Sequence, residues 1–167
     1  MSKAVMLSIR PKWCEKIASG EKTIEVRKTR PKLQTPFKCY IYCTLDKINY
    51  RTNTVGQCNG KVIGEFTCDR IYELAPLNRA PDDVEKQARL TREEIVNYLK
   101  GTGYGWHISD LKIYDTQKEL TEFHTRRKCK SCSKSGYEST ACIYDENCMV
   151  PVAITKAPQS WCYVEEG

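Results

Sequence analysis

The sequence contains few histidines and no long apolar segment, and each of these shortages excludes a class of protein. Only His107 and His124 are present among the 167 residues, so paired imidazoles working as acid and base are not favoured. No apolar run approaches the roughly 20 residues that span a bilayer as a helix. The first residues lack the apolar core of a signal peptide because Arg10 and Lys12 interrupt them. We therefore expect a cytoplasmic protein with no membrane contact.

Internal repeats and low-complexity segments are also missing, and the composition is that of one soluble domain. Hydrophobic residues make up 40% of the chain and charged residues 29%, so we expect a single domain over residues 1–167 and a monomer. The patterns predict strands near residues 4–9, 23–28, 37–44, 61–72, 105–114 and 160–165. Two helices interrupt this series, which favours the α+β class with a small mixed sheet.

The two predicted helices carry clear start and stop signals. The first runs from Lys12 to Ser19, with Trp13 expected in the core. The second begins at Thr91, which forms a capping box with Glu94. Three of its residues are expected to face inward: Ile95, Tyr98 and Leu99.

The positive charge of the chain is concentrated near its N-terminus. Residues 1–38 contain ten Lys or Arg and three Asp or Glu, a net charge of +7, whereas the whole chain carries +6. The remainder is therefore close to neutral. A basic face favours an anionic partner such as nucleic acid, a nucleotide or phosphate. On charge alone, a solvated surface without a partner explains the pattern equally well.

The ten cysteines fall into a scattered group and a cluster. The scattered ones are predicted to be small buried residues, because cytosolic thiols stay reduced; they are Cys14, Cys39, Cys43, Cys58, Cys68 and Cys162. The cluster lies in an insert at about 124–150 and consists of Cys129, Cys132, Cys142 and Cys148. Its first pair has the spacing of two thiolates on one zinc ion, so we expect structural zinc. An unliganded insert and a disulfide or redox role are the alternatives, and no organic cofactor is indicated.

The stretch SGEKTIEVRKTRP, Ser19–Pro31, is a predicted strand with an unusual density of charge. Alternate side chains of a strand share a face, so Glu25 and Arg27 point one way while Ile24 and Val26 point into the core. An exposed ion pair on a surface strand would explain the charges without any function. A polar wall of a binding pocket is the other interpretation.

The segment resembles the ASCH domain family of the PUA-like superfamily, whose pattern is Gly-x-Lys-Thr-x-Glu-x-Arg after a strand and a short helix. The matching residues here are Gly20, Lys22, Thr23, Glu25 and Arg27. The resemblance continues at residues 44–47, 62–66, 104–115 and 157–166 and is strongest to bacterial and phage members. It implies a PUA-like small mixed β-barrel with flanking helices and an RNA- or nucleotide-binding cleft at the motif.

In such a cleft, each charged residue of the motif has an implied role. Lys22 and Arg27 would meet phosphate or the acceptor edge of a base, and Glu25 would accept from an exocyclic amine. Ser8 and Lys12, at the junction of the first strand and helix, would add a donor and a charge. The implied partner is RNA, a nucleotide or a modified nucleoside.

The neighbours of these residues complete the expected site. Gly20 would let a ligand approach closely, and Thr23 shares the strand face of Glu25. Arg30, with Lys28 and Lys32, would contact phosphates at the periphery. Four side chains could stack on a base or belong to the core: Trp106, His107, Tyr40 and Trp161.

Two other functions stay open beside a binding module. Some small ASCH proteins are amidohydrolases that deacetylate N4-acetylcytidine with a lysine, a threonine and a glutamate, and ribonuclease activity has also been proposed in the family. The lysine corresponds to Lys22, whereas Glu25 stands where the threonine lies and Glu85 is the nearest acidic candidate. Lys22 and Glu25 are therefore the candidate catalytic residues. A protein-interaction module is the remaining alternative.

Overall fold

The computed structural model describes residues 2–45, 60–75, 79–128 and 149–167. Strands outnumber helices in this part of the chain, which confirms the α+β class. The strands are β1 (Lys3–Ile9), β2 (Ile24–Arg27), β3 (Phe37–Cys43), β4 (Lys61–Cys68), β5 (Ile71–Glu73), β6 (Tyr104–His107), β7 (Ser109–Lys118), β8 (His124–Lys128), β9 (Met149–Ala153) and β10 (Trp161–Glu165). The helices are α1 (Pro11–Ala18), α2 (Val84–Ala88), α3 (Arg92–Leu99) and the 3-10 turn η2 (Leu120–Glu122).

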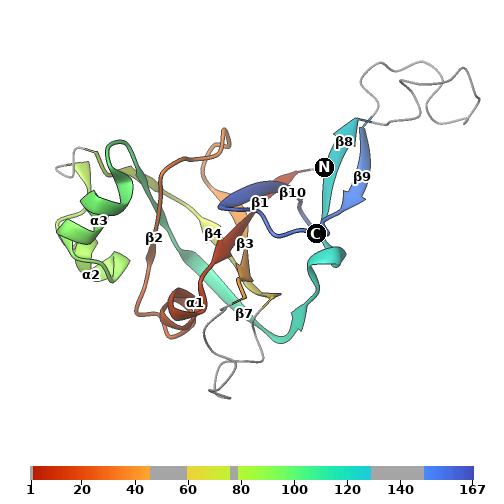
Figure 1. The fold of residues 1–167 in the computed structure, drawn as a ribbon, viewed down its shortest axis with the longest axis horizontal. Helices are drawn as coiled ribbons and strands as arrows, with labels where there is room; N and C mark the ends of the chain where they lie inside the picture. The colour runs from red at the N-terminus through yellow and green to blue at the C-terminus, as the bar shows by residue number, and fades with distance from the viewer. Residues whose placement is uncertain (1, 46–59, 76–78, 129–148) are drawn as a thin grey trace, which may run out of the picture.

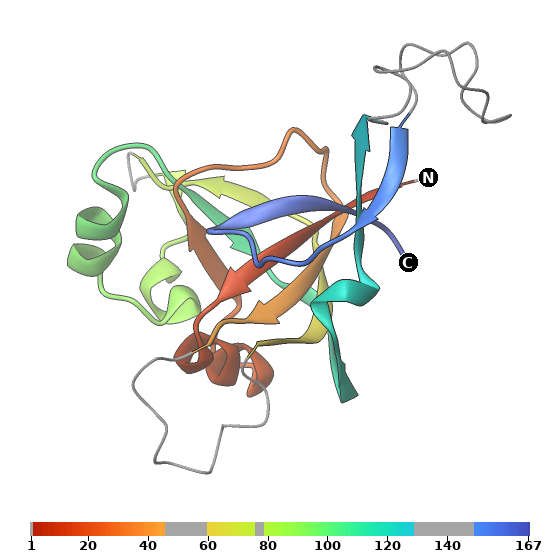
Figure 2. The same cartoon turned by 45° about the vertical axis from the view of Figure 1, so that its right-hand side comes forward.

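The described strands pair into three sheets. The largest has the order β10-β1-β3-β4-β7. In it β1 runs parallel to β3, and the chain between them, which contains α1 and β2, provides the crossover connection that a parallel pair needs. The second sheet has the order β2-β6-β5, and β8 pairs with β9 in the third. Figures 1 and 2 show α2 and α3 together at one end of the molecule, away from β8 and β9. These pairings do not by themselves close a barrel, so the PUA-like barrel stays a prediction.

The two faces of β2 have different surroundings, and this difference creates the site. Ile24 and Val26 pack with Leu74 of the loop after β5 and with residues of α2 and α3 such as Val84 and Ile95. Both are buried, which confirms that they anchor the strand to the core. The opposite face of β2 is buried as well, although it carries charged side chains.

Two predicted strands are each divided between two sheets. The chain leaves the five-stranded sheet after Cys68 and joins the three-stranded sheet as β5, so the single strand predicted at 61–72 is wrong. Likewise β6 and β7 replace the strand predicted at 105–114, with Ile108 between them. Alternation of apolar and polar residues continues across such a corner, so the sequence pattern does not show it.

Helix α3 begins as the sequence predicts, but one of the three residues expected to face inward is exposed. The Thr91 hydroxyl accepts from the Glu94 amide at 3.2 Å, and the Thr91 amide donates to the Glu94 carboxylate at 2.8 Å. Ile95 and Leu99 are buried, as expected, whereas Tyr98 is 45% exposed. Tyr98 is therefore available to line a pocket beside β2.

The scattered cysteines are mostly core residues. Cys14, Cys39, Cys43 and Cys68 are buried, and all four are reduced cysteines. Cys162 is only partly buried, and Cys58 lies outside the described residues. Burial raises the pKa of the Cys68 thiol to about 12, which removes it as a nucleophile near neutral pH.

Candidate functional site

Three charged side chains are buried side by side on β2 and the residue pair before it. The side chains of Lys22, Glu25 and Arg27 are 2%, 8% and 8% exposed. Glu25 lies between the two cations: its Oε2 is 3.4 Å from Lys22 Nζ, and its Oε1 is 3.0 Å from Arg27 Nη2. This arrangement, which we call the buried triad, is not the exposed ion pair that would need no function. It holds two positive charges and one negative charge.

The backbone around the triad fixes both cations. Lys22 Nζ donates to the carbonyl of Ala88 at 2.7 Å, where α2 ends and its dipole favours a positive charge. Arg27 Nη2 donates to the Ser8 carbonyl at 2.8 Å, and its Nη1 donates to the carbonyl and hydroxyl of Ser160 at 3.3 and 3.2 Å. Both terminal nitrogens of Arg27 are thus engaged within the chain. Arg27 positions Glu25 and connects β2 to β1. Its buried Nε has no hydrogen-bond partner among the residues that the structure describes.

Burial changes the proton affinity of Lys22. Loss of solvent lowers the pKa of the Lys22 ammonium, and the attraction of Glu25, which acts in the opposite direction, does not cancel this effect. The sequence indicates that Glu25 would raise the pKa of Lys22, but it does not show that burial lowers this pKa by more. A lysine of lowered pKa gives up its proton more readily than a surface lysine.

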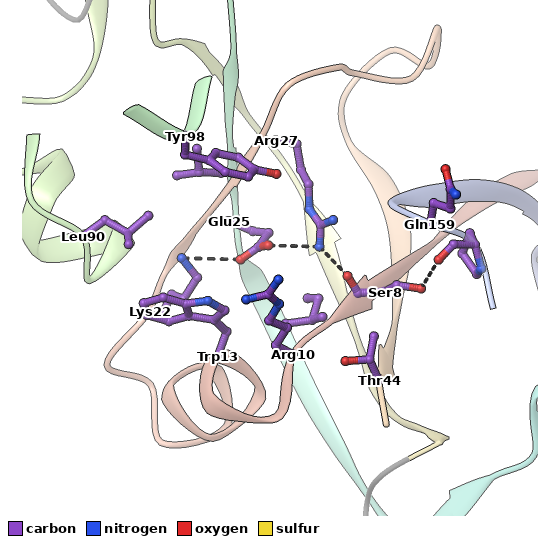
Figure 3. Close-up of a pocket in the computed structure, with 13 residues that line it drawn as sticks. Ser8, Arg10, Trp13, Lys22, Glu25, Arg27, Thr44, Leu90, Tyr98 and Gln159 are labelled. Carbon is purple, nitrogen blue, oxygen red and sulfur yellow. Dashed lines mark hydrogen bonds and ion pairs between the residues drawn. The ribbon is translucent and has the colours of Figure 1, made fainter. Parts of the chain in front are cut away.

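The triad forms one wall of a pocket of about 420 Å³, a size typical of small-ligand sites. Figure 3 shows two halves on either side of Glu25. The aromatic half contains Trp13, Leu90 and Tyr98 next to Lys22, and the polar half contains Ser8, Thr44 and Gln159. The Arg10 side chain reaches between Trp13 and Ser8. The remaining lining residues are Ile9, Val26 and Pro158.

Of the predicted ligand-binding residues, four line this pocket: Ser8, Lys22, Glu25 and Arg27. The Ser8 hydroxyl donates to the Pro158 carbonyl at 2.6 Å, which leaves its oxygen able to accept a hydrogen bond. Lys12 is exposed at the rim, with its Nζ 4.6 Å from the centre of the Trp13 ring.

The other predicted ligand-binding residues lie outside the pocket lining. Gly20 ends α1 with a φ of +75°, so its glycine is explained by the turn. The Thr23 hydroxyl is 3.3 Å from the Gln87 side-chain oxygen. Arg30 is exposed and lies over the Tyr104 ring.

The aromatic side chains of the pocket are not the predicted ones. Trp106 is fully buried against Phe37, and the ring nitrogen of His107 is 2.6 Å from Asp69. Trp13, expected in the core, packs partly against it and also lines the pocket together with Tyr98. The pattern of α1 could not separate these roles, because one apolar stripe faces the pocket at its first turn and the core at its last.

The clustered cysteines of the predicted metal site lie outside the described residues; they are Cys129, Cys132, Cys142 and Cys148. Strands β8 and β9 flank this segment. Within the described ranges no group of three or more His, Cys, Asp or Glu side chains could hold a metal ion. Zinc in the insert stays a prediction.

Comparisons with known proteins agree with this fold. None of the helices that the structure describes is both long and apolar enough to cross a membrane. No curated protein matches the chain. Three crystal structures of the ASCH protein from Zymomonas mobilis resemble this chain. Two are single-residue variants, tyrosine to phenylalanine and serine to alanine, and the third carries no named substitution. The TM-scores are 0.53, 0.52 and 0.51 in this order, each at 20% sequence identity.

The structural match extends over most of both proteins. The first variant aligns over 71% of this chain and 77% of its own, and the other two align over 70% of this chain and 74% and 73% of theirs. At this identity the likeness establishes the fold. The family profile for the ASCH domain matches residues 7–124, which include all of the buried triad. The chain therefore belongs to the ASCH domain family.

Proposed function

We propose that the protein binds RNA and that its pocket accepts one unpaired nucleotide of the strand. The observation that supports this function best is the position of Glu25, a buried carboxylate held between two cations beside an aromatic wall. Membership of the ASCH family, which is generally thought to bind RNA, favours the same class of partner. A free nucleotide is the smaller ligand that fits the same chemistry.

The chemistry of the pocket suits a base. A carboxylate only accepts hydrogen bonds, so Glu25 would select a base edge that offers an N–H group. Each Glu25 oxygen is paired with one cation and retains capacity for a second donor. Lys22 Nζ donates to Ala88 and is paired with Glu25, and a further ammonium hydrogen would be donated to an acceptor of the base. The rings of Trp13 and Tyr98 line the pocket, and a base that stacks on them would share them with the lysines that lie over these rings, which are Lys12, Lys22 and Lys28.

The surface next to the pocket suits a strand rather than an isolated base. Lys28 lies over the Tyr98 ring at 5.3 Å, and Lys12 lies over the Trp13 ring. Each of these two aromatic rings of the pocket therefore has a lysine next to it. Arg30, two residues beyond Lys28, is also exposed and continues this positive surface. A backbone that enters the pocket at one base would pass these side chains.

We expect the affinity for a short unstructured RNA to fall steeply with salt. For about three neutralised phosphates, raising the salt from 50 to 200 mM should weaken binding by roughly 20-fold, because counterions are released on binding. Fluorescence anisotropy with a labelled oligonucleotide measures this dependence. Lys28→Ala should reduce the slope, whereas Lys118→Ala, whose ammonium lies beside Tyr114 outside the pocket, should not. An affinity that does not change with salt would contradict the proposal.

A hydrolase is the second candidate function, and one observation favours it. The lowered pKa of Lys22 beside Glu25 makes the pair suited to moving a proton. Against this, Lys22 is held by Ala88 and Glu25 and has limited freedom to reach a substrate. Turnover of N4-acetylcytidine or RNA by the purified protein, lost in Lys22→Met, would favour catalysis over binding alone.

A further inference from the structure

We propose that the polar half of the pocket is a phosphate subsite formed by Arg10 and the first turn of α1, so that the pocket takes a nucleotide and discriminates against a nucleoside. This inference rests on the proposed function, because the base of the same ligand would occupy the aromatic half. It assigns Arg10 as the residue that determines this specificity.

The start of α1 concentrates positive charge. Arg10 occupies the N-cap position without a side-chain cap, and the first turn contains no acidic residue. Lys12 adds another positive charge at the positive end of the helix dipole, where a carboxylate would normally be favoured. Two cations at this end are unfavourable for the isolated helix. An anion bound there would remove the repulsion.

The same turn presents an unused amide. Pro11 has no N–H group, and the amides of Trp13 and Cys14 both donate to the Arg10 carbonyl, at 2.9 and 3.0 Å. The Lys12 amide therefore has no partner within the helix. Backbone amides at a helix start are the donors that commonly bind phosphate oxygens.

A second and independent observation is the unpaired donor of Arg27. Its side chain is 8% exposed and lines the pocket, and its Nε is buried with no hydrogen-bond partner in the described part of the chain. Arg10, for its part, has no carboxylate oxygen within 4.0 Å among the described residues. A phosphate group, whose oxygens accept hydrogen bonds and carry negative charge, would give the Arg10 guanidinium an anionic partner.

The arrangement of the two halves links this phosphate to a base. Figure 3 places Ser8, Thr44 and Gln159 on the side of Glu25 opposite Leu90 and Tyr98. One continuous pocket of about 420 Å³ includes both sides. A nucleotide has the same division, with a flat base, a hydroxyl-bearing sugar and an anionic end. A free monophosphate and a nucleotide within RNA share this chemistry.

The experiment compares each of the four ribonucleosides with its 5′-monophosphate by isothermal titration calorimetry. At least one monophosphate should bind about tenfold or more tightly than its nucleoside. Arg10→Ala should remove most of this difference, because it should weaken binding of the monophosphate far more than binding of the nucleoside. Arg79→Ala, which removes an exposed arginine paired with Glu73, should change neither affinity.

A short unstructured RNA forms the third arm of the same experiment. If its binding is Arg10-dependent and tighter than that of the monophosphate, the phosphate belongs to a strand; if only the monophosphate binds, the ligand is a free nucleotide. Equal affinities for nucleoside and monophosphate, or equal losses of both in Arg10→Ala, would overturn the phosphate subsite and leave the proposed base pocket intact. Absence of binding by all three ligands would overturn both.

Discussion

Replacing Glu25 by Gln is expected to lower the free energy of unfolding by about 3–5 kcal/mol, the typical cost of leaving a buried charge without its partner. The substitution keeps the shape of the side chain but leaves Lys22 and Arg27 as two buried cations with no anion between them. Urea denaturation followed by circular dichroism measures the loss.

The chain offers a matched control for this result. Glu21 also pairs with one lysine and one arginine, Lys16 at 2.7 Å and Arg89 at 2.9 Å, but its side chain is 40% exposed. Because water screens an exposed pair, Glu21→Gln should unfold close to the wild-type midpoint. Lys22→Met should also be milder than Glu25→Gln, because Glu25 would keep Arg27. If Glu25→Gln is as stable as Glu21→Gln, the triad does not hold the site together.

Replacing Tyr98 by Ala is expected to weaken RNA binding by about 5- to 150-fold, which corresponds to the 1–3 kcal/mol of one base stacked on an aromatic ring. Tyr98 is 45% exposed, so the variant should fold normally. Tyr98→Phe should retain binding, since it keeps the ring. Fluorescence anisotropy with the same labelled RNA measures the three affinities.

The control for Tyr98 lies on the same helix. Val96 is 53% exposed and does not line the pocket, so Val96→Ala tests whether loss of any exposed side chain of α3 reduces binding. We expect no change in affinity for Val96→Ala. Wild-type affinity in Tyr98→Ala would show that the base does not stack on this ring.

The sequence predicts which charged residues form the triad better than it predicts how they are buried. Alternation along residues 23–28 correctly separates Ile24 and Val26 from Glu25 and Arg27. It does not show that both faces of β2 are buried, because the covering residues come from distant parts of the chain. Ala88 contacts Lys22 from 66 positions away, and Ser160 contacts Arg27 from 133.

These distant contacts change the role of Arg27. From the motif alone it resembles a ligand-binding cation, whereas in the structure its two terminal nitrogens contact Ser8, Glu25 and Ser160. Its positive charge still contributes to the pocket, but its main effect is to orient Glu25. Lys28 is predicted from the sequence only as a peripheral phosphate contact, and the structure places it over the Tyr98 ring. Arg10 lies outside the motif, and its place in the pocket lining becomes visible only in the structure.

The aromatic wall illustrates the same limit. Trp13 and Tyr98 both lie at helical positions that suit the core, and local periodicity cannot show that a pocket rather than a packed interior lies opposite them. The capping box of α3 was predictable because Thr91 and Glu94 interact within one turn. Local interactions such as the capping box can therefore be predicted from the sequence, whereas identifying the residues that line the pocket requires the folded structure.

The indole N–H signals of the three tryptophans in a ¹H–¹⁵N NMR spectrum test the location of the ligand most directly. Trp13 lines the pocket, whereas Trp106 is fully buried and Trp161 donates its indole N–H to Thr29 at 3.0 Å. On titration with a short unstructured RNA, we expect the signal assigned to Trp13 through Trp13→Phe to shift strongly, while the Trp106 and Trp161 signals move little. A Trp13 signal that stays in place while RNA binds and other amides shift would contradict a nucleotide pocket at the buried triad.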